Sequence, residues 1–270
     1  MSRVPPPLQA GAAIAPGYSV AGHLHRGDAL DVYEVWSQER DCLCIAKLLR
    51  PDRVKDVRPR RRLFREGRLL QQLTHPHIVR AYETLSRPQP VLILETLSGA
   101  TLAHVLEVEL VQQRFPVQEL AVLGLQLCSA TAYLHRHRLL HLDLKPANIV
   151  AEGGRVKVID LSLVRRPGRG RKGAGTRQYM APEQALGRTL TEATDVWGIG
   201  ATLYESAAGS RPFPSRPRVR YPQLIQRAQP AAAHRRLPRE LAVAIDACLE
   251  PAPRDRPSVA ELAAVLEPLA

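Results

Sequence analysis

The sequence is short of aromatic residues and of cysteine, and each shortage argues against a class of protein. Tyrosine, phenylalanine and tryptophan make up only 4% of the 270 residues, whereas proteins that bind single-stranded nucleic acid stack the bases on aromatic side chains. The four cysteines include no Cys-x-x-Cys spacing, so reduced thiols are expected rather than disulfides or a zinc site. No uninterrupted apolar run reaches the roughly 18 residues of a membrane span, and none near the N-terminus has the length of a signal peptide. We therefore expect a cytoplasmic protein without a membrane span.

The charge balance is strongly positive, while the rest of the composition is ordinary. The chain has 38 lysines and arginines against 26 aspartates and glutamates, a formal net charge of +12, and 45% of its residues are hydrophobic. That apolar share is enough for a sizeable core and rules out wholesale disorder. The excess positive charge raises the hypothesis of an anionic partner such as nucleic acid. Because the arginines are scattered and aromatic residues are few, this hypothesis is the least favoured.

Hydrophobic patterning divides the chain into a strand-rich part and a helix-rich part. Residues 1–17 read as a flexible leader, and residues 59–73 suit one helix. The pattern predicts an α+β protein of two lobes: a small β-rich lobe at about 18–97 with one helix, and a larger α-rich lobe at about 98–270. The clearest strand candidates of the first lobe are residues 32–36, 42–48 and 91–94.

One strand pair interrupts the helix-rich part. Strand segments at 149–150 and 156–159 flank the glycine pair 153–154, which is a turn signal. Folding the chain about this pair places Asn148 beside Asp160 at the open end of the hairpin. An amide oxygen next to a carboxylate is a hard-oxygen site suited to Mg²⁺. Turn-forming residues at strand ends are also common by themselves, so a purely structural role is the alternative.

Short motifs follow one another in an order that resembles the protein kinases. Residues 141–148 read HLDLKPAN and resemble the catalytic loop of that family, and residues 175–183 read GTRQYMAPE and resemble its substrate platform. One motif alone can arise by chance, but six in the same order make coincidence remote. The resemblance runs over nearly the whole chain and implies one kinase domain at 18–270, similar to the bacterial-type serine/threonine kinases. The other matching positions are residues 44–47, 75–79, 160–162, 195–200 and Arg256.

The resemblance implies a role for each matching charged side chain. Lys47 is the implied partner of the ATP phosphates and of Glu66 on the helix. Asn148 and Asp160 are the implied Mg²⁺ ligands, which neutralise charge in the transition state. Asp143 is expected to accept or orient the proton of the substrate hydroxyl.

The resemblance also implies which residues favour a particular acceptor hydroxyl and which form the nucleotide pocket. Lys145 is implied to lie near the γ-phosphate, and together with Thr176 it favours a serine or threonine acceptor over tyrosine. Gly27 belongs to the segment that resembles the phosphate-covering loop. Glu183 and Arg256 are interpreted as a buried structural pair. The adenine pocket and hinge would be formed by Val32, Leu94, Glu95, Leu97 and Val150.

The nucleotide-binding segment departs from the family pattern. Of the three glycines expected before Val32 only Gly27 is present, and His25 and Leu30 occupy the other two positions. Because glycine lets a backbone approach phosphate and adopt positive φ, we expect a stiffer loop. Asp28 and Asp31 would add negative charge near ATP. Ile45 replaces the usual alanine on the same face as Lys47 and adds bulk against adenine.

Two regulatory positions also depart from the pattern. Leu142 replaces the arginine that pairs with a phosphorylated activation loop, so any such switch is expected not to act through this residue. Leu161-Ser162 stands in place of Phe-Gly. Residues 168–173 fit G-x-G-x-x-G but do not follow a strand and open a helix, so they are interpreted as a mobile basic loop. The basic residues in and just before this segment either attract acidic substrates or a phosphorylated partner or, as the favoured interpretation, belong to a solvated mobile loop: Arg165, Arg166, Arg169, Arg171 and Lys172.

Two main hypotheses follow from these departures. The favoured one is an enzyme that transfers the γ-phosphoryl group of Mg²⁺-ATP to Ser or Thr of protein substrates, because Lys47, Asp143 and Asp160 are all present. The alternative is a pseudokinase, a binding or scaffold module with weak or no ATP binding, which His25 and Ile45 motivate. In either case a regulatory partner protein would supply the signal.

Overall fold

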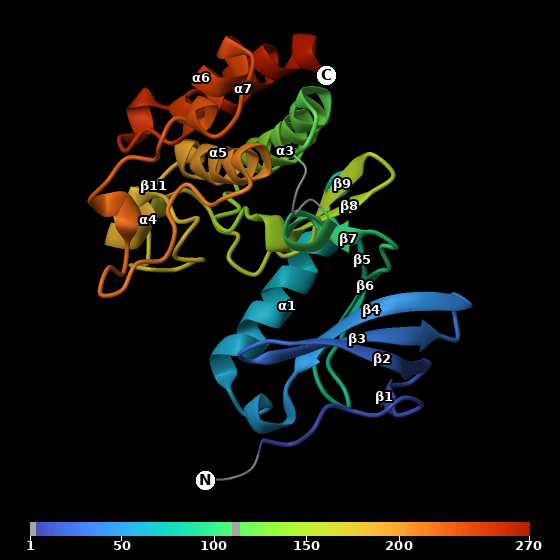
Figure 1. Ribbon diagram of the computed structural model, residues 1–270. Helices are drawn as coiled ribbons and strands as arrows, with labels where there is room; N and C mark the ends of the chain where they lie inside the picture. Colours follow the sequence, from blue (N-terminus) through green and yellow to red (C-terminus); the bar gives the residue numbers. More distant parts are fainter. Residues whose placement is uncertain (1–3, 110–113) are drawn as a thin grey trace. The chain divides into compact units, whose positions relative to one another are not determined.

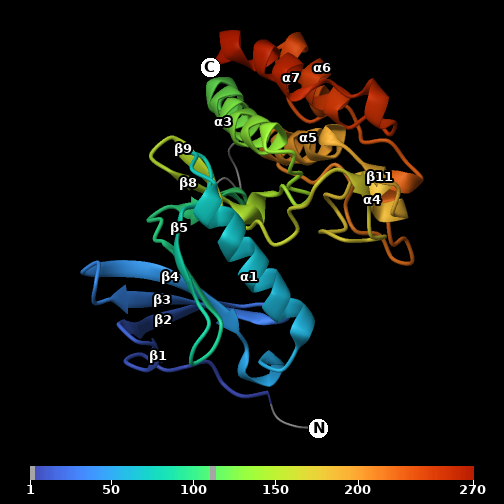
Figure 2. The same cartoon turned by 180° about the vertical axis from the view of Figure 1, so that it is seen from behind.

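The computed structural model describes residues 4–109 and 114–270 and divides the chain into two compact units. The β-rich unit runs to Thr74 and resumes over Ile78–Ser98, and the helical unit comprises His75–His77 and Gly99–Ala270. Figures 1 and 2 show the sheet and its one long helix in the first unit and the helices of the second. The predicted α+β fold with a small strand-rich lobe and a larger helical lobe is confirmed.

The β-rich unit is an antiparallel sheet covered on one side by a helix. Its strands pair in the order β1-β2-β3-β4-β6-β5. Helix α1, Val57–Gln72, packs against β4, β5 and β6 and buries Leu63 and Leu70. Gly67 brings this helix close to β5, since a Cβ atom there would lie 2.1 Å from Thr84 Oγ1. The strands are β1 Ala13–Ala15, β2 Tyr18–Arg26, β3 Leu30–Ser37, β4 Cys42–Leu49, β5 Ala81–Leu85 and β6 Val91–Glu95.

The N-terminal segment departs from the expected flexible leader. Residues of β1 pair with β2, Ala13 opposite Ser19 and Ala15 opposite Tyr18. Before β1, the Leu8 N–H donates a hydrogen bond of 3.0 Å to the Tyr33 hydroxyl. The prediction of a leader over residues 1–17 is therefore wrong for β1 and the residues that lead into it. Proline and alanine obscured the segment in the sequence because three strand residues carry too little pattern to be recognised.

The helical unit is built around α3, which packs against α5 and α7. Helix α3 is long and apolar enough for a membrane span by length and composition alone, but half of its apolar window is buried inside the protein, as in a core helix. Gly124 permits the close packing, because a Cβ atom there would lie 2.5 Å from Leu266. The helices are α2 Leu102–His104, α3 Val117–Arg136, α4 Pro182–Leu186, α5 Glu192–Ala208, α6 Arg239–Cys248 and α7 Val259–Leu266.

Two small sheets complete the helical unit. One contains β7 Ala100–Thr101, β8 Ile149–Glu152 and β9 Arg155–Val158, and the other pairs β10 Gly168–Arg169 with β11 Thr189–Leu190. Single 3₁₀ or π turns cover Pro51–Arg53 in the first unit and, in this one, Val105–Glu109, Pro146–Asn148, Pro222–Leu224, Ala231–Ala233, Pro253–Asp255 and Glu267–Leu269.

The glycine-rich basic segment 168–173 is not the free loop that the sequence predicts. Besides the β10–β11 pairing, the Gly170 N–H donates to the Arg188 carbonyl at 2.8 Å and the Gly173 N–H to the Gln184 carbonyl at 3.1 Å. Gly168 and Gly173 have φ of 130° and 68°, which other residues rarely adopt. The glycines thus serve close packing and positive φ in this segment, which is why it matches a phosphate-binding pattern by composition alone.

Glu183 and Arg256 form the buried pair expected from the sequence. Arg256 Nη1 and Nη2 bind the two Glu183 carboxylate oxygens at 2.8 and 2.9 Å, and both side chains are almost fully buried. The same guanidinium donates to the carbonyls of Ala193 and Glu250 and lies 4.9 Å from the Trp197 ring. A charge pair this deep is stabilising only while both partners are present.

We predict that Arg256→Ala lowers the free energy of unfolding by about 3–5 kcal/mol, because it leaves the Glu183 carboxylate buried and uncompensated. Urea denaturation measures the change. Arg254→Ala is the matched control: that side chain is 89% exposed, and its removal should change stability by no more than about 0.5 kcal/mol. Equal losses in the two variants would contradict the assignment.

Candidate active site

Lys47 and Glu66 form an ion pair within the β-rich unit. Strand alternation buries Cys44 and Ala46 in the sheet core and turns Ile45 and Lys47 to the opposite face. Lys47 Nζ lies 2.7 Å from Glu66 Oε1, and the Glu66 side chain is 1% exposed. Burial distinguishes this contact from an ordinary surface ion pair, because a carboxylate so far from water needs its partner.

The hairpin between β2 and β3 carries the one surviving glycine of the loop. Gly27 lies at its tip, where the Gly27 N–H donates to the Leu30 carbonyl at 2.8 Å. Val32, on β3, is the cross-strand neighbour of both His25 and Lys47. The sequence-predicted residues Gly27, Val32 and Lys47 are therefore brought together on one hairpin and its neighbouring strand.

Asp31 does not project toward a nucleotide, contrary to the sequence expectation. Its side chain is 1% exposed and its two carboxylate oxygens accept hydrogen bonds from Arg26 Nε and Nη2 at 2.7 and 2.8 Å. Burial by itself would raise the pKa of Asp31, but the hydrogen bonds and charge of Arg26 outweigh it and lower that pKa. The charge of Asp31 is neutralised by Arg26, so of the two aspartates in this segment only Asp28 is exposed.

The segment expected to be the hinge begins at the end of β6. The Glu95 N–H donates to the Arg80 carbonyl at 3.0 Å, and Glu95 Oε1 accepts from the Arg80 N–H at 2.8 Å. Leu94 is buried and pairs with Ile45, and Leu97 lies partly buried just beyond the strand. Ile45 therefore lies beside Leu94, one of the residues expected to form the adenine pocket and hinge.

The helical unit gathers the catalytic-loop residues around the Asp143 carboxylate. Asp143 Oδ1 accepts hydrogen bonds from the Thr176 N–H and hydroxyl, both at 2.9 Å. Asp143 Oδ2 lies 3.1 Å from Lys145 Nζ and 3.0 Å from Asn148 Nδ2. Lys145 Nζ also donates to the Thr176 hydroxyl. One carboxylate is thus held in a fixed orientation by a cation, an amide and a hydroxyl.

Asn148 and Asp160 lie at neighbouring strand ends, as the hairpin register predicts. Ile149 pairs with Val158, and the Ile159 N–H donates to the Asn148 carbonyl at 3.0 Å. Both described hydrogen bonds of Asn148 Nδ2 go to Asp143, so the amide oxygen of Asn148 makes none of them. Hard oxygen donors of this kind fit Mg²⁺.

Two further contacts concern Asp160 and the neighbouring Val150. Asp160 Oδ1 accepts a hydrogen bond of 2.9 Å from the Ser162 N–H. That bond holds the start of the segment that carries Leu161-Ser162. Val150, on β8, is buried beside them in the small three-stranded sheet.

Asp195 is a positioning residue whose role the motif alone did not reveal. From helix α5 its buried carboxylate accepts hydrogen bonds of 2.8 Å from the backbone N–H groups of both His141 and Leu142, and His135 Nε2 lies 2.9 Å away. Leu142 has φ of 68°, a left-handed conformation that a branched residue rarely adopts. The carboxylate of Asp195 thus holds the turn that presents Asp143.

Leu142 also has a packing role that replaces an ionic one. It is 7% exposed and belongs to a cluster with Leu140 and Leu190, against which Leu163 packs. The catalytic loop is therefore joined to β11 by apolar contacts at the position where the family carries an arginine. Such apolar contacts form without a phosphate group.

His141 is fully buried beneath the catalytic loop. Its Nδ1 accepts a hydrogen bond of 3.2 Å from the Asp143 N–H. Burial lowers the pKa of His141 below its usual value, because the charged imidazolium is disfavoured away from water. The neutral ring keeps Nδ1 as an acceptor for the loop.

We predict that the stability of the protein falls as the pH drops from 7 to 5, in part through His141. The unfolded chain takes up the proton near pH 6.5 while the folded ring resists it, so each pH unit removes up to about 1.4 kcal/mol. In urea denaturation at pH 7, 6 and 5, His141→Asn should lose less stability than the wild type, since asparagine keeps an acceptor and does not titrate. Parallel losses in both proteins would contradict this role.

Comparison with known proteins finds a matching family and similar kinases. A family model described as the protein kinase domain matches residues 18–265. The chain is 33% identical over 181 residues to serine/threonine-protein kinase PknB of Mycolicibacterium smegmatis, covering 62% of this chain and 28% of that one. It is 30% identical over 211 residues to myosin light chain kinase 3 of Mus musculus, covering 74% of this chain and 26% of that one.

Solved structures give a similar result. The crystal structure of the Mycobacterium tuberculosis PknI kinase domain superimposes with a TM-score of 0.76 at 25% identity, covering 98% of this chain and all of that one.

The chain spans only about a quarter of the length of the two curated relatives described above.

Proposed function

Because this chain belongs to the protein kinase domain family, we propose that it transfers the γ-phosphoryl group of Mg²⁺-ATP to serine or threonine hydroxyls of protein substrates. The observation that carries the proposal is the network around Asp143, in which Lys145, Asn148 and Thr176 all contact one carboxylate. The serine/threonine kinases among its relatives support the same acceptor class. The free cysteines of the described chain fit a reducing compartment, and we propose the cytoplasm.

The chain's own residues account for the steps of such a transfer. Asp143 accepts the proton of the substrate hydroxyl as the hydroxyl oxygen forms a bond to the γ-phosphorus. The bond from that phosphorus to the bridging oxygen breaks, and ADP leaves with the electron pair. Lys145 offsets the charge that develops on the transferred group, and Lys47, held by Glu66, binds the phosphates that remain.

Mg²⁺ fits the oxygen donors of the helical unit. Asn148 Oδ1 and the Asp160 carboxylate would hold it, and the bound ion would neutralise phosphate charge. These donors are kept in register by the β8–β9 hairpin rather than by a flexible loop.

We predict that Asp143→Asn and Lys47→Met each lower phosphoryl transfer by at least about 100-fold, because one removes the proton acceptor and the other a phosphate-binding cation. Incorporation of labelled phosphate from ATP into generic acceptor proteins measures the loss. Lys55→Met, a change at an exposed lysine of the same unit, should leave the rate unchanged. Incorporation that neither active-site variant reduces would contradict the assigned roles.

The main rival function is a binding module with the same fold. Ile45, on the same strand as Lys47, and Leu94, on β6, are cross-strand neighbours. His25 and Leu30 occupy glycine positions of the loop. If these side chains exclude adenine, the protein would act through partners alone.

We predict that Mg²⁺-ATP raises the melting temperature of the protein, since a ligand at 100 times its Kd adds about 2.7 kcal/mol of stability. A thermal-shift titration up to millimolar nucleotide measures the effect, with Mg²⁺ alone as its reference. A melting temperature that does not move would favour the binding module over the enzyme.

A further inference from the structure

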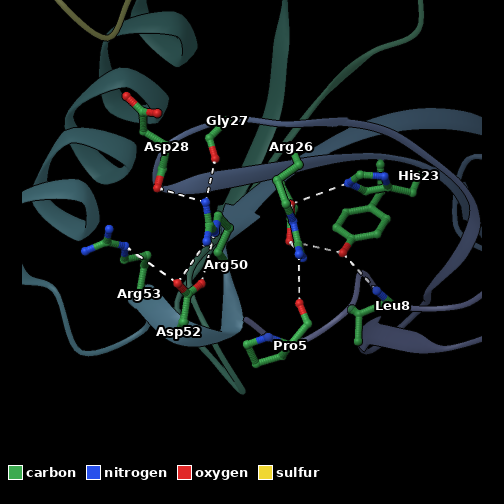
Figure 3. A network of polar contacts seen from close by, with 11 residues as sticks. Pro5, Leu8, His23, Arg26, Gly27, Asp28, Arg50, Asp52 and Arg53 are labelled. Atoms are coloured by element: carbon green, nitrogen blue, oxygen red, sulfur yellow. Dashed lines mark hydrogen bonds and ion pairs between the residues drawn. The ribbon is translucent and has the colours of Figure 1, made fainter. Parts of the chain in front are cut away.

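The tip of the β2–β3 hairpin is fastened to the rest of the β-rich unit by one side chain. Arg50 follows β4, and its Nη1 donates to the carbonyls of Gly27 and Asp28 at 3.1 and 3.3 Å (Figure 3). Its Nε and Nη2 bind the two carboxylate oxygens of Asp52 at 3.0 and 2.9 Å. The Arg50 side chain is only 14% exposed, so this is an ordered contact and not a solvated surface arginine.

The backbone of Arg50 adds a third contact to the same tip. Its N–H donates to the Ala29 carbonyl at 3.0 Å, as a continuation of the β3–β4 pairing. Three consecutive carbonyls, those of Gly27, Asp28 and Ala29, therefore point to Arg50. The hydrogen bonds from Arg50 also lower the pKa of Asp52, which keeps this carboxylate charged and in place.

Because the peptide bond is planar, the contacts of Arg50 with the carbonyls also determine the direction of the N–H groups at the tip. In a trans peptide the carbonyl and the next N–H point in opposite directions. Since the carbonyls of Gly27 and Asp28 point to Arg50, the N–H groups of Asp28 and Ala29 point away from it. Neither of these two groups donates to another described residue. Successive backbone N–H groups aimed to one side form a site for an anion.

The contact of Arg50 with the tip also explains how this loop is ordered although two of the expected glycines are absent. None of residues 25–30, all of which the structure describes, has a positive φ, Gly27 included. The tip thus uses backbone conformations open to any residue. What orders it is the guanidinium of Arg50 at the tip and the Arg26–Asp31 pair at its base.

We propose that Arg50 is a positioning residue for nucleotide binding, which fixes the peptide planes of the hairpin tip so that the Asp28 and Ala29 N–H groups face the ATP phosphates. This inference rests on the proposed function, because it assumes that the hairpin covers a nucleotide. Arg50 itself points to the carbonyl side of the tip and acts through the backbone. Asp52 holds the guanidinium in the required plane.

The first arm of the test needs no nucleotide. Amide hydrogen exchange of the hydrogen-bonded N–H groups around the tip of the apo protein, that of Gly27 in particular, should be about 10-fold faster in Arg50→Ala than in the wild type, as expected for the loss of hydrogen bonds to a charged group. Arg53→Ala is the matched control, since among the described residues the Arg53 side chain pairs with Asp52 and Asp56 and has no contact with the tip. Equal exchange in Arg50→Ala and the wild type would overturn the proposed positioning.

The second arm measures the affinity for Mg²⁺-ATP by calorimetry and the KM for ATP. Arg50→Ala should lower the affinity about 10-fold and raise the KM for ATP about 10-fold. The kcat should change little, because the catalytic groups are untouched. Arg50→Lys should not restore the affinity or the KM, since an ammonium cannot bind two carbonyls and chelate a carboxylate at once. Full rescue by lysine would show plain charge attraction and overturn the proposal, and so would faster exchange with unchanged affinity.

A third variant guards against a folding defect. Asp52→Asn leaves Arg50 in the protein and removes only the charge that orients it, so it should shift exchange and affinity in the same direction by a smaller factor. If the wild type binds no nucleotide, the proposed function fails while the exchange experiment still decides whether Arg50 orders the tip.

Discussion

The catalytic loop depends on one buried carboxylate. Asp195 accepts hydrogen bonds from the backbone of His141 and Leu142 and thereby holds Leu142 in a left-handed conformation. Without that acceptor two buried N–H groups would lack partners and the strained turn would relax. Asp143 directly follows this turn, and its carboxylate contacts Lys145, Asn148 and Thr176.

The departures from the family pattern have structural replacements in this chain. An apolar cluster around Leu142 joins the catalytic loop to β11 where an arginine would need a phosphate partner. Arginine contacts order the β2–β3 hairpin where glycines would leave it pliable. In the catalytic loop a contact that would depend on a phosphate is replaced by permanent apolar packing, and in the hairpin a flexible glycine-rich tip is replaced by one that arginine contacts hold in place. The charged set of Lys47, Asp143 and Asp160 is kept alongside them, which is why we favour an enzyme over a scaffold.

The sequence predicts the local features well because they depend on short-range patterns. Alternation placed Ile45 and Lys47 on one face of β4, and the register about the glycine pair 153–154 placed Asn148 next to Asp160. It could not reveal contacts between distant segments whose residue types are common. Asp195 meets its partners across more than 50 positions, and Arg50 is one of many arginines. Asp31 was misplaced for a different reason: its partner Arg26 is only five residues away, but the sequence does not show that the hairpin turns these two side chains toward each other.

The most direct test of this account is a crystal structure of the protein with Mg²⁺ and a non-hydrolysable ATP analogue. The account predicts a metal ion bound by Asn148 Oδ1 and the Asp160 carboxylate, with Lys47 in contact with the phosphates of the analogue and still paired with Glu66. A structure grown at saturating nucleotide in which these side chains bind no ligand, and in which Ile45 and Leu30 fill the space for adenine, would contradict it.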